Sequence, residues 1–220
     1  MARAKGMTVS KAWATIHAWM DRHAPSVRAK LNPPADEAAL ARLQATLGVQ
    51  LPEDFLASYR IHDGAHRVSG PILGVPFLSA AGIAKEWKEL KPKRGDDCPA
   101  PEEPVSAQPG AIREVGWSAG WVPFAGPDEE NYLALDFDPG PNGTAGQVIN
   151  FGADQLIYGS KRYVLAASFR DFMTFLTGQF AGGGVEVVDD SDFLRLTRRR
   201  EDGSACNLLT GVHLLFGGKK

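Results

Sequence analysis

The stretch Asn131 to Gly152, NYLALDFDPGPNGTAGQVINFG, contains two apolar runs separated by a loop rich in glycine and proline. Each run alternates and includes β-branched or aromatic residues, which is typical of a strand. Pro139, Gly140 and Pro141 supply the restricted and the permissive backbone angles that a turn requires. Because the connection is too short for a parallel crossover, the segment predicts an antiparallel β-hairpin.

The first strand of this hairpin ends in two aspartates, Asp136 and Asp138. Side chains alternate between the two faces of a strand, so Leu133 and Leu135 lie on one face and both aspartates on the other. We therefore expect the aspartates on an exposed face of the sheet, opposite the apolar face.

Two binding motifs are considered for the loop itself. A calcium loop would place an oxygen ligand at its fifth position and glutamate at its twelfth, where Gly140 and Gln147 stand. A phosphate cradle would have its glycines spaced G-x-G-x-x-G before a helix, whereas a strand follows Gly146. The loop is therefore interpreted as a hairpin connection without a cofactor or a metal.

The same strand pattern recurs elsewhere in the chain, and helical patterns flank it. Further strands are predicted at 71–78, 120–126 and 162–168, with one or two more at 185–188 and 193–198. Helices are predicted around Trp13, Ile16 and Met20, from the cap Asp36 to Gly48, from Pro52 toward Gly64, over 80–90, and from the cap Ser168. This order predicts an α+β fold in which helices flank a largely antiparallel central sheet.

Composition excludes several classes of protein. The 220 residues are 44% hydrophobic and carry a net charge of −2, so no global basic field attracts nucleic acid or anionic lipid. Only Cys98 and Cys206 are present, which excludes a disulfide framework and fits a reducing cytoplasm. No export signal is recognised, and the longest uncharged stretch, 68–84, is too short and too rich in proline to cross a membrane. Residues 91–110, rich in proline and charge, are predicted to form a mobile excursion.

The strongest literal match to an enzyme motif is GWSAG, from Gly116 to Gly120, which fits the G-x-S-x-G nucleophile elbow of hydrolases. That elbow joins a strand to a helix, but Pro123 lies in the strand pattern that follows here. His213 comes later in the chain, so a triad in the required order is possible. A serine esterase using Ser118 therefore stays open as an alternative.

Two weaker signals are the histidine pair and the arginine run. His62 and His66 are four residues apart, a spacing that suits a metal on a helix, but Gly64 between them interrupts helical structure. Arg198 to Arg200 could contact phosphate, and nucleic-acid binding is kept as a second alternative.

The order of the elements resembles the SUKH superfamily, in its Smi/Knr-like branch. The resemblance is carried by LPEDFLASYRIHDGA, GWVPFAG, DEENYLALDFDPGP, GQVINFG and VLAASFRDFMTFL, in this order. The positions that fall on family motifs are Leu51, Pro52, Asp54, Gly64, Trp121, Asp136, Asp138, Pro139 and Gly140. Gly126-Pro127 and the excursion at 91–110 depart from the pattern.

The resemblance implies a domain without catalytic residues that acts through protein contacts. Bacterial members look like immunity proteins that neutralise polymorphic toxins, and fungal members like regulators of cell-wall glucan synthesis. We expect a Smi/Knr-like domain at 36–180, an N-terminal helical extension at 1–35 and a C-terminal extension at 181–220 with one or two added strands. The candidate contact residues are five acids predicted to form one acidic patch: Asp128, Glu129, Glu130, Asp136 and Asp138.

Overall fold

The computed structural model describes residues 6–66, 70–93, 105–153, 160–187 and 194–217. The helices are α1 (Val9–His23), α2 (Pro25–Ala29), α3 (Glu37–Leu47), α4 (Glu53–Tyr59), α5 (Ala80–Lys93), α7 (Phe169–Ala181) and α8 (Val212–Phe216). The strands are β1 (Trp121–Asp128), β2 (Asn131–Asp136), β3 (Gln147–Gly152), β4 (Val164–Ala166), β5 (Val185–Val187), β6 (Leu194–Arg199) and β7 (Ala205–Cys206). The predicted α+β class is confirmed.

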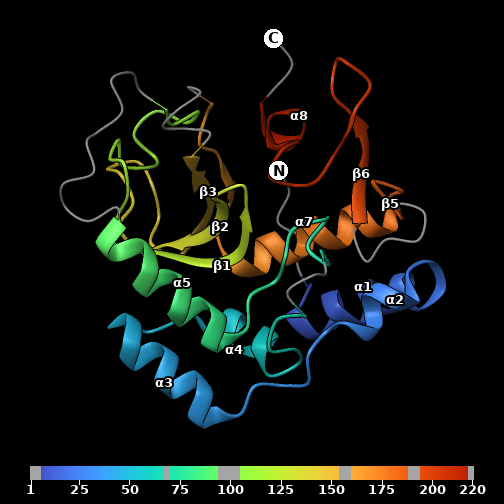
Figure 1. Cartoon of the computed structure of the whole chain (residues 1–220), viewed down its shortest axis with the longest axis horizontal. Helices are drawn as coiled ribbons and strands as arrows, with labels where there is room; N and C mark the ends of the chain where they lie inside the picture. The colour runs from blue at the N-terminus through green and yellow to red at the C-terminus, as the bar shows by residue number, and fades with distance from the viewer. Residues whose placement is uncertain (1–5, 67–69, 94–104, 154–159, 188–193, 218–220) are drawn as a thin grey trace.

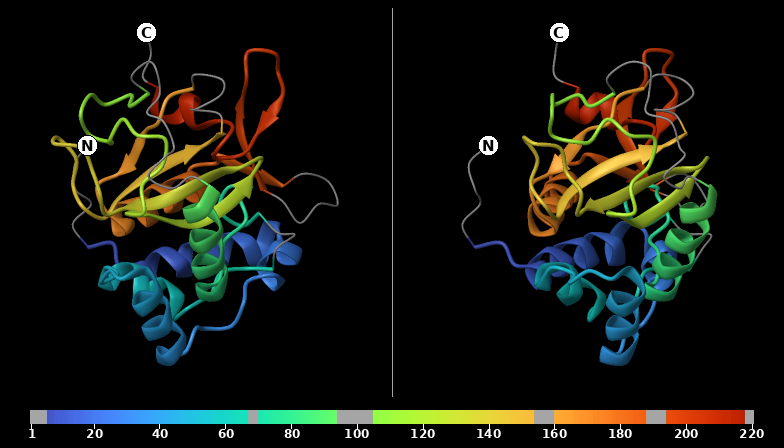
Figure 2. Two further views of the ribbon diagram at one scale, coloured as in Figure 1. Left: turned by 60° about the vertical axis from the view of Figure 1, so that its left-hand side comes forward. Right: turned by 90° about the vertical axis from the view of Figure 1, so that its left-hand side faces the viewer.

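The central sheet is built around the hairpin quoted above. Its strands run in the order β1-β2-β3-β4, and each pairs antiparallel with its neighbour. Asn131 lies opposite Gly152 and Asp136 lies opposite Gln147, so the predicted hairpin is confirmed. Figure 1 shows this sheet beside α7, and Figure 2 shows α1 to α4 below the sheet, with α8 on its upper side.

One face of the sheet packs on the helices through aromatic rings. Phe124 of β1 lies 5.5 Å from Phe169 and 5.6 Å from Phe172 of α7, measured between ring centroids. Phe55 of α4 completes the cluster, 4.9 Å from Phe169. Aromatic pairs at such separations add to the hydrophobic stabilisation of the buried area. Leu135 lies opposite Val122, which shares the face of Phe124, so Leu133 and Leu135 lie on this face, as their alternation predicts.

The opposite face is also buried, which corrects the expectation of an exposed face. All six residues of β2 are buried, and Asp136 has 0% exposure. The face is covered by the segment from Val105 to Ala119, which lies between α5 and β1 in the sequence. We call this segment the cover. Its carbonyl at Ala111 accepts a hydrogen bond from Nε2 of Gln147 at 2.9 Å.

This cover corrects the predicted excursion at residues 105–110, and residues 91–93 correct it as well, because they belong to α5. Residues 94–104 lie outside the described part of the chain, so the prediction for them is not tested. Val105 is 4% exposed, and its carbonyl accepts a hydrogen bond from the Arg162 amide at 2.8 Å. The amide of Ala107 in turn donates to the Arg162 carbonyl at 2.8 Å. This part of the segment is therefore tied to the start of β4.

Side chains and glycines end the helices largely as the sequence predicts. The Asp36 side chain accepts a hydrogen bond from the Ala39 amide, and Gly48 ends α3 with φ of +70°. Ser168 caps α7 through the Asp171 amide. Thr8 caps α1 through the Lys11 amide, and Pro52 is the N-cap of α4, so α4 begins at Glu53, one residue after its predicted start.

Segment 71–78 does not form the predicted strand. It makes isolated bridges, one of which pairs Phe77 with Ala125 at the edge of β1. The Leu78 amide donates to the Phe124 carbonyl at 3.0 Å, and the Gly126 amide donates to the Pro76 carbonyl at 2.9 Å. Two prolines within eight residues limit the ladder, because proline has no amide hydrogen to donate.

Both flanking regions pack against the central domain. α1 lies along α7, with Trp19 and Phe180 in edge-to-face contact at 5.1 Å. β5, β6 and β7 form a second, antiparallel sheet, and the α8 residue Phe216 lies 5.1 Å from Phe175 of α7. The C-terminal region thus has more structure than the one or two added strands we expected. The boundaries at 35 and 180 stay a prediction.

Candidate functional site

The five acidic residues do not form a single patch. Asp128, Glu129 and Glu130 lie at the turn between β1 and β2, where Asp128 is opposite Asn131. Asp136 lies at the other end of β2, roughly 17 Å away by the rise of a strand. The predicted patch is therefore wrong, and two acidic groups lie at opposite ends of one strand.

The first group is the turn itself. Glu129 and Glu130 have φ of 48° and 62°, the left-handed region that a tight hairpin turn needs and that glycine or asparagine fills more readily. Both side chains are exposed. Asp128 is held from one side, since its Oδ2 accepts a hydrogen bond from Nδ2 of Asn207 at 2.8 Å. This group is kept as a candidate for contact with a partner.

Asp136 is an interior group. Its Oδ2 accepts from Nε2 of Gln147 at 2.9 Å, and its Oδ1 accepts from the Asp138 amide at 2.9 Å. Burial raises the pKa of the Asp136 carboxyl above its usual range, and these hydrogen bonds oppose that rise. The residue fixes the end of β2 and the start of the loop, so it is removed from the candidate contacts.

Asp138 is half-exposed and already paired. It accepts a hydrogen bond from the Ser118 hydroxyl at 2.5 Å and forms an ion pair with the Arg113 guanidinium. Both partners belong to the segment that covers the sheet. The pairing therefore links the hairpin loop to its cover, and it satisfies much of the charge that a partner could use.

Ser118 is not arranged as a nucleophile. Its hydroxyl donates to Asp138 and accepts from the Gly120 amide at 3.1 Å. A serine nucleophile needs a histidine within hydrogen-bond reach, and among the described contacts of Ser118 there is none. GWSAG precedes β1, so a strand follows the motif where the hydrolase elbow has a helix.

The motif residues near the start of α4 join separate elements. The Leu51 amide donates to Oε1 of Gln44 in α3 at 2.9 Å. Oδ2 of Asp54 accepts from the Arg170 amide at 2.9 Å, which places the carboxylate at the N-terminus of α7. Gly64 has φ of +69° and lies after α4, not at its last turn. These contacts suit a structural role for the motif.

The motif residues of the sheet lie under the cover. Trp121 has 0% exposure and packs against the Arg162 guanidinium, whose carbon lies 4.8 Å from the ring centroid. Gly140, which follows Pro139, comes so close to the cover that a Cβ there would lie 2.3 Å from the Gly110 carbonyl oxygen. Only glycine permits that approach.

His62 and His66, the two histidines considered as a metal-binding pair, do not contact each other. His66 is exposed, whereas His62 contacts His17 of α1. Nδ1 of His62 lies 2.7 Å from the Asn32 carbonyl and so carries the hydrogen. Nε2 of neutral His62 is then an acceptor, and Nε2–H of His17 donates to it at 2.8 Å. The pair joins α1 to the segment after α4.

This pair predicts a loss of stability in acid. Burial, Arg28 and His62 lower the pKa of His17 from its ordinary 6.5 to about 4, with Asp21 opposing them. As pH falls from 6.5 toward 4, the unfolded chain binds a proton that the folded chain does not, so the free energy of unfolding falls. We expect His17→Gln to flatten this dependence in urea unfolding measured from neutral pH to about pH 5. His66→Gln is the control and should keep the wild-type slope; equal slopes for all three proteins would contradict the assignment.

The arginine run is largely engaged within the C-terminal region. Nη1 of Arg198 donates to the Leu214 carbonyl at 2.5 Å, and Arg199 forms an ion pair with Glu186. Nη2 of Arg200 lies 3.4 Å from the Thr210 carbonyl. These contacts account for the run without nucleic acid. Within the described residues there is also no cluster of three or more metal-ligating side chains, and no helix long and apolar enough to cross a membrane.

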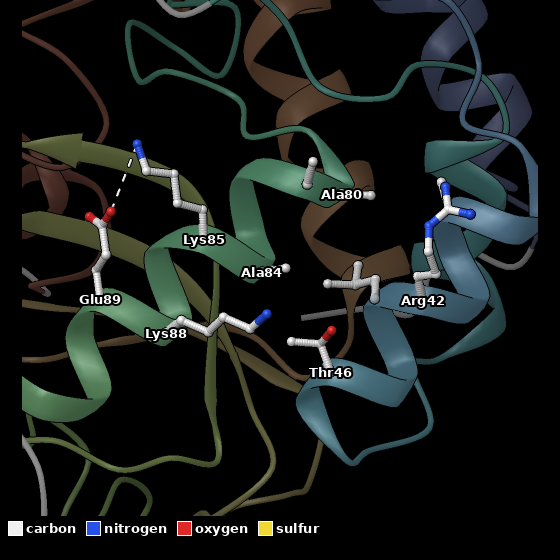
Figure 3. A pocket seen from close by; sticks show the side chains of 10 residues that line it. Arg42, Thr46, Ala80, Ala84, Lys85, Lys88 and Glu89 are labelled. Carbon is white, nitrogen blue, oxygen red and sulfur yellow. Dashed lines mark ion pairs between the residues drawn. The ribbon is translucent and has the colours of Figure 1, made fainter.

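A hollow that the sequence did not reveal lies between α3 and α5. It has a volume of about 530 Å³ and is lined by residues of these two helices: Ala39, Arg42, Leu43, Thr46, Ala80, Ala81, Ala84, Lys85, Lys88 and Glu89. We call it the α3–α5 groove. Figure 3 shows Lys88 reaching from α5 toward Thr46 of α3, and Lys85 paired with Glu89 beside it.

Comparison with known families decides the relationship. The model of the SMI1 / KNR4 family (SUKH-1) matches residues 34–174, which is well over half of the chain. The chain belongs to the SMI1/KNR4 family. The resemblance noted in the sequence is thereby confirmed.

Three relatives of this SMI1/KNR4 chain come from fungi. The chain is 31% identical over 201 residues to the "Cell wall biosynthesis/cell cycle regulator smi1" of Schizosaccharomyces pombe, covering 86% of this chain and 39% of that protein. It is 29% identical to the "KNR4/SMI1 homolog" of Yarrowia lipolytica, over 85% of this chain and 32% of that protein. With the "Cell wall assembly regulator SMI1" of Saccharomyces cerevisiae it shares 24% identity, over 82% of this chain and 42% of that protein.

These SMI1/KNR4 relatives are longer proteins, and this chain spans about a third to two fifths of their length. The shared region nevertheless exceeds residues 34–174, because the alignments cover 82–86% of this chain. Similarity therefore extends into the flanking segments. That agrees with the packing of α1 and of the C-terminal sheet against the family domain.

Proposed function

We propose that this SMI1/KNR4 domain is a non-enzymatic, cytoplasmic regulator that acts by binding a protein partner. The observation that carries the proposal is the family match over residues 34–174, together with relatives named as regulators of cell-wall assembly. Cell-wall synthesis is the process in which we place it. A toxin-neutralising role is the other function implied by the superfamily, and none of the relatives reported above bears such a name.

The absence of catalysis is supported by the state of Ser118. Ser118 is 8% exposed, and its hydroxyl donates to a carboxylate that is itself paired with Arg113. A carboxylate that receives the serine hydrogen bond directly replaces the imidazole that a hydrolase requires. Contacts with a partner would instead use exposed surface, such as the turn at Glu129 and Glu130.

The proposal is tested by binding between purified components. The tagged chain would be used to isolate proteins from cells of its own source, and the recovered protein would be purified and titrated by calorimetry. We expect saturable binding to a protein of the cell-wall synthesis machinery. The double variant Glu129→Lys and Glu130→Lys, titrated in the same way, tests whether the acidic turn contributes to the affinity for the partner. Binding only to a secreted toxin would favour the immunity role, and no direct binding to any recovered protein would contradict both.

Ser118→Ala tests the esterase alternative. We expect wild type and variant to hydrolyse a simple p-nitrophenyl ester at the rate of the buffer alone, because nothing in the described structure activates the hydroxyl. The release of nitrophenol measures the rate. Hydrolysis by wild type that falls by about a hundredfold or more in the variant would show a serine esterase and overturn the proposal.

A further inference from the structure

The α3–α5 groove is an open hollow between two helices that meet through small side chains. Ala39 of α3 and Ala80, Ala81 and Ala84 of α5 line it, and Leu43 gives it an apolar floor. A volume of about 530 Å³ lies within the range of sites that bind ligands, and it suits a few anchoring side chains of a peptide.

The rim of the groove is basic. Arg42 contributes from α3, and Lys85 and Lys88 contribute from α5, against one acid, Glu89. Glu89 lies 3.8 Å from Lys85, and both side chains are about half exposed, so this pair is weak and screened. The rim therefore carries an excess of positive charge in a chain whose net charge is −2.

Two of these cations are not used by the fold. Neither Arg42 nor Lys88 forms an ion pair with another residue of the described chain. Arg60, by contrast, pairs with Glu37 at the start of α3 and with Glu53 at the start of α4. Arg42 of α3 and Lys88 of α5 both line the groove, from opposite walls; in Figure 3 Lys88 reaches toward Thr46 and Arg42 extends along the side of α3.

We propose that the α3–α5 groove binds an acidic, amphipathic helical segment of the protein partner; this rests on the proposed function. The apolar face of such a segment would place leucine-sized side chains on Leu43 and the alanines. Its carboxylates would meet Arg42 and Lys88 on the two walls. Helix-in-groove recognition uses this combination, in which apolar anchors supply affinity and charges set the choice of partner.

The test uses a defined peptide and the full chain. The probe is a synthetic helix of about 15 residues in which leucines recur at helical spacing and glutamates fill the other face. Its counterpart carries lysine in place of every glutamate. In ¹⁵N–¹H spectra we expect the acidic peptide to shift amides of residues 39–46 and 80–89 in a saturable way, and the lysine peptide to cause no shifts there.

Charge reversal distinguishes the groove from general attraction. Arg42→Glu with Lys88→Glu should weaken binding of the acidic peptide by about tenfold or more, since each lost charge pair counts toward affinity. Lys11→Glu with Arg22→Glu makes the same change of charge on exposed positions of α1 and should leave the affinity within about twofold of wild type. Ala81→Trp fills the groove without a change of charge and should also abolish the shifts.

Several results would overturn the inference. Equal binding of the acidic and lysine peptides, shifts that map elsewhere, or unchanged affinity of the Arg42 and Lys88 variant would each do so. Circular dichroism melts of every variant show whether it folds. If the natural partner still binds that variant as it binds wild type, the groove assignment fails while the proposed function stands; ester hydrolysis dependent on Ser118 would overturn the function independently.

Discussion

Gly64→Ala is expected to lower the free energy of unfolding by about 3 kcal/mol, because the alanine would be held in a left-handed backbone conformation and its methyl group would clash with a neighbouring segment. Gly64 has φ of +69°, and a Cβ there would lie 2.4 Å from the backbone carbon of Leu78. Because the neighbouring atom belongs to the main chain, it cannot relieve the clash by a change of rotamer, as a flexible side chain could. The clash would push the segment after α4 away from residues 78 and 79, which lead into α5.

Gly48→Ala is a matched control for this prediction. Gly48 has φ of +70°, but a Cβ there meets nothing within 4 Å. The two variants therefore share the backbone cost and differ in the clash, and Gly48→Ala should lose only about 1 kcal/mol. Urea unfolding followed by circular dichroism gives both values. Equal losses would show that the contact with Leu78 relaxes easily and would contradict the argument.

Arg162→Met is expected to cost about 3–4 kcal/mol, because buried carbonyl acceptors and an aromatic contact lose their partner together. Nη1 of Arg162 donates to the Val115 carbonyl at 2.6 Å, and Nη2 donates to the Gly116 carbonyl at 3.1 Å. The guanidinium also stacks on Trp121, and the side chain has 0% exposure. Methionine would keep part of the packing but none of the donors.

The measurement combines urea unfolding with tryptophan fluorescence. Loosening of the cover should admit water near Trp121 and shift the native emission to longer wavelength. Arg113→Met is the control, since Arg113 lies on the same cover but pairs with Asp138 at the surface, and we expect a loss of less than about 1 kcal/mol. Similar losses for the two variants would mean that Arg162 does not hold the cover.

Local patterns in the sequence were sufficient for many elements of the fold, but not for segment 71–78 or for β7 and α8. The alternation of Leu133 and Leu135, the turn chemistry of residues 139–143 and the cap Asp36 each depend on neighbours along the chain, and each prediction was confirmed. The family resemblance followed from the order of these elements. The contacts of the motif residues Trp121 and Gly140 are made with or beneath the cover, so local patterns did not predict them.

The candidate site could not be predicted to the same extent, because it depends on contacts between distant segments. Asp136 looks exposed from alternation alone, and only a cover some twenty to thirty residues earlier in the chain buries it. The basic excess of the α3–α5 groove is invisible in a sequence of net negative charge, since Arg42 and Lys88 are far apart along the chain. His17 likewise carried no signal of its pairing with His62, which lies 45 residues away.

The short bridges at both sides of the central sheet limit how a partner can attach. Residues 76–78 pair with the outer side of β1, and residues 105–107 pair with Arg162 just before β4. These are the positions at which a foreign strand would add to the sheet, either in peptide recognition or in aggregation. Recognition by strand addition is therefore blocked at these two edges by the chain itself, which leaves the side chains of turns and helices as the means by which a partner can be recognised there.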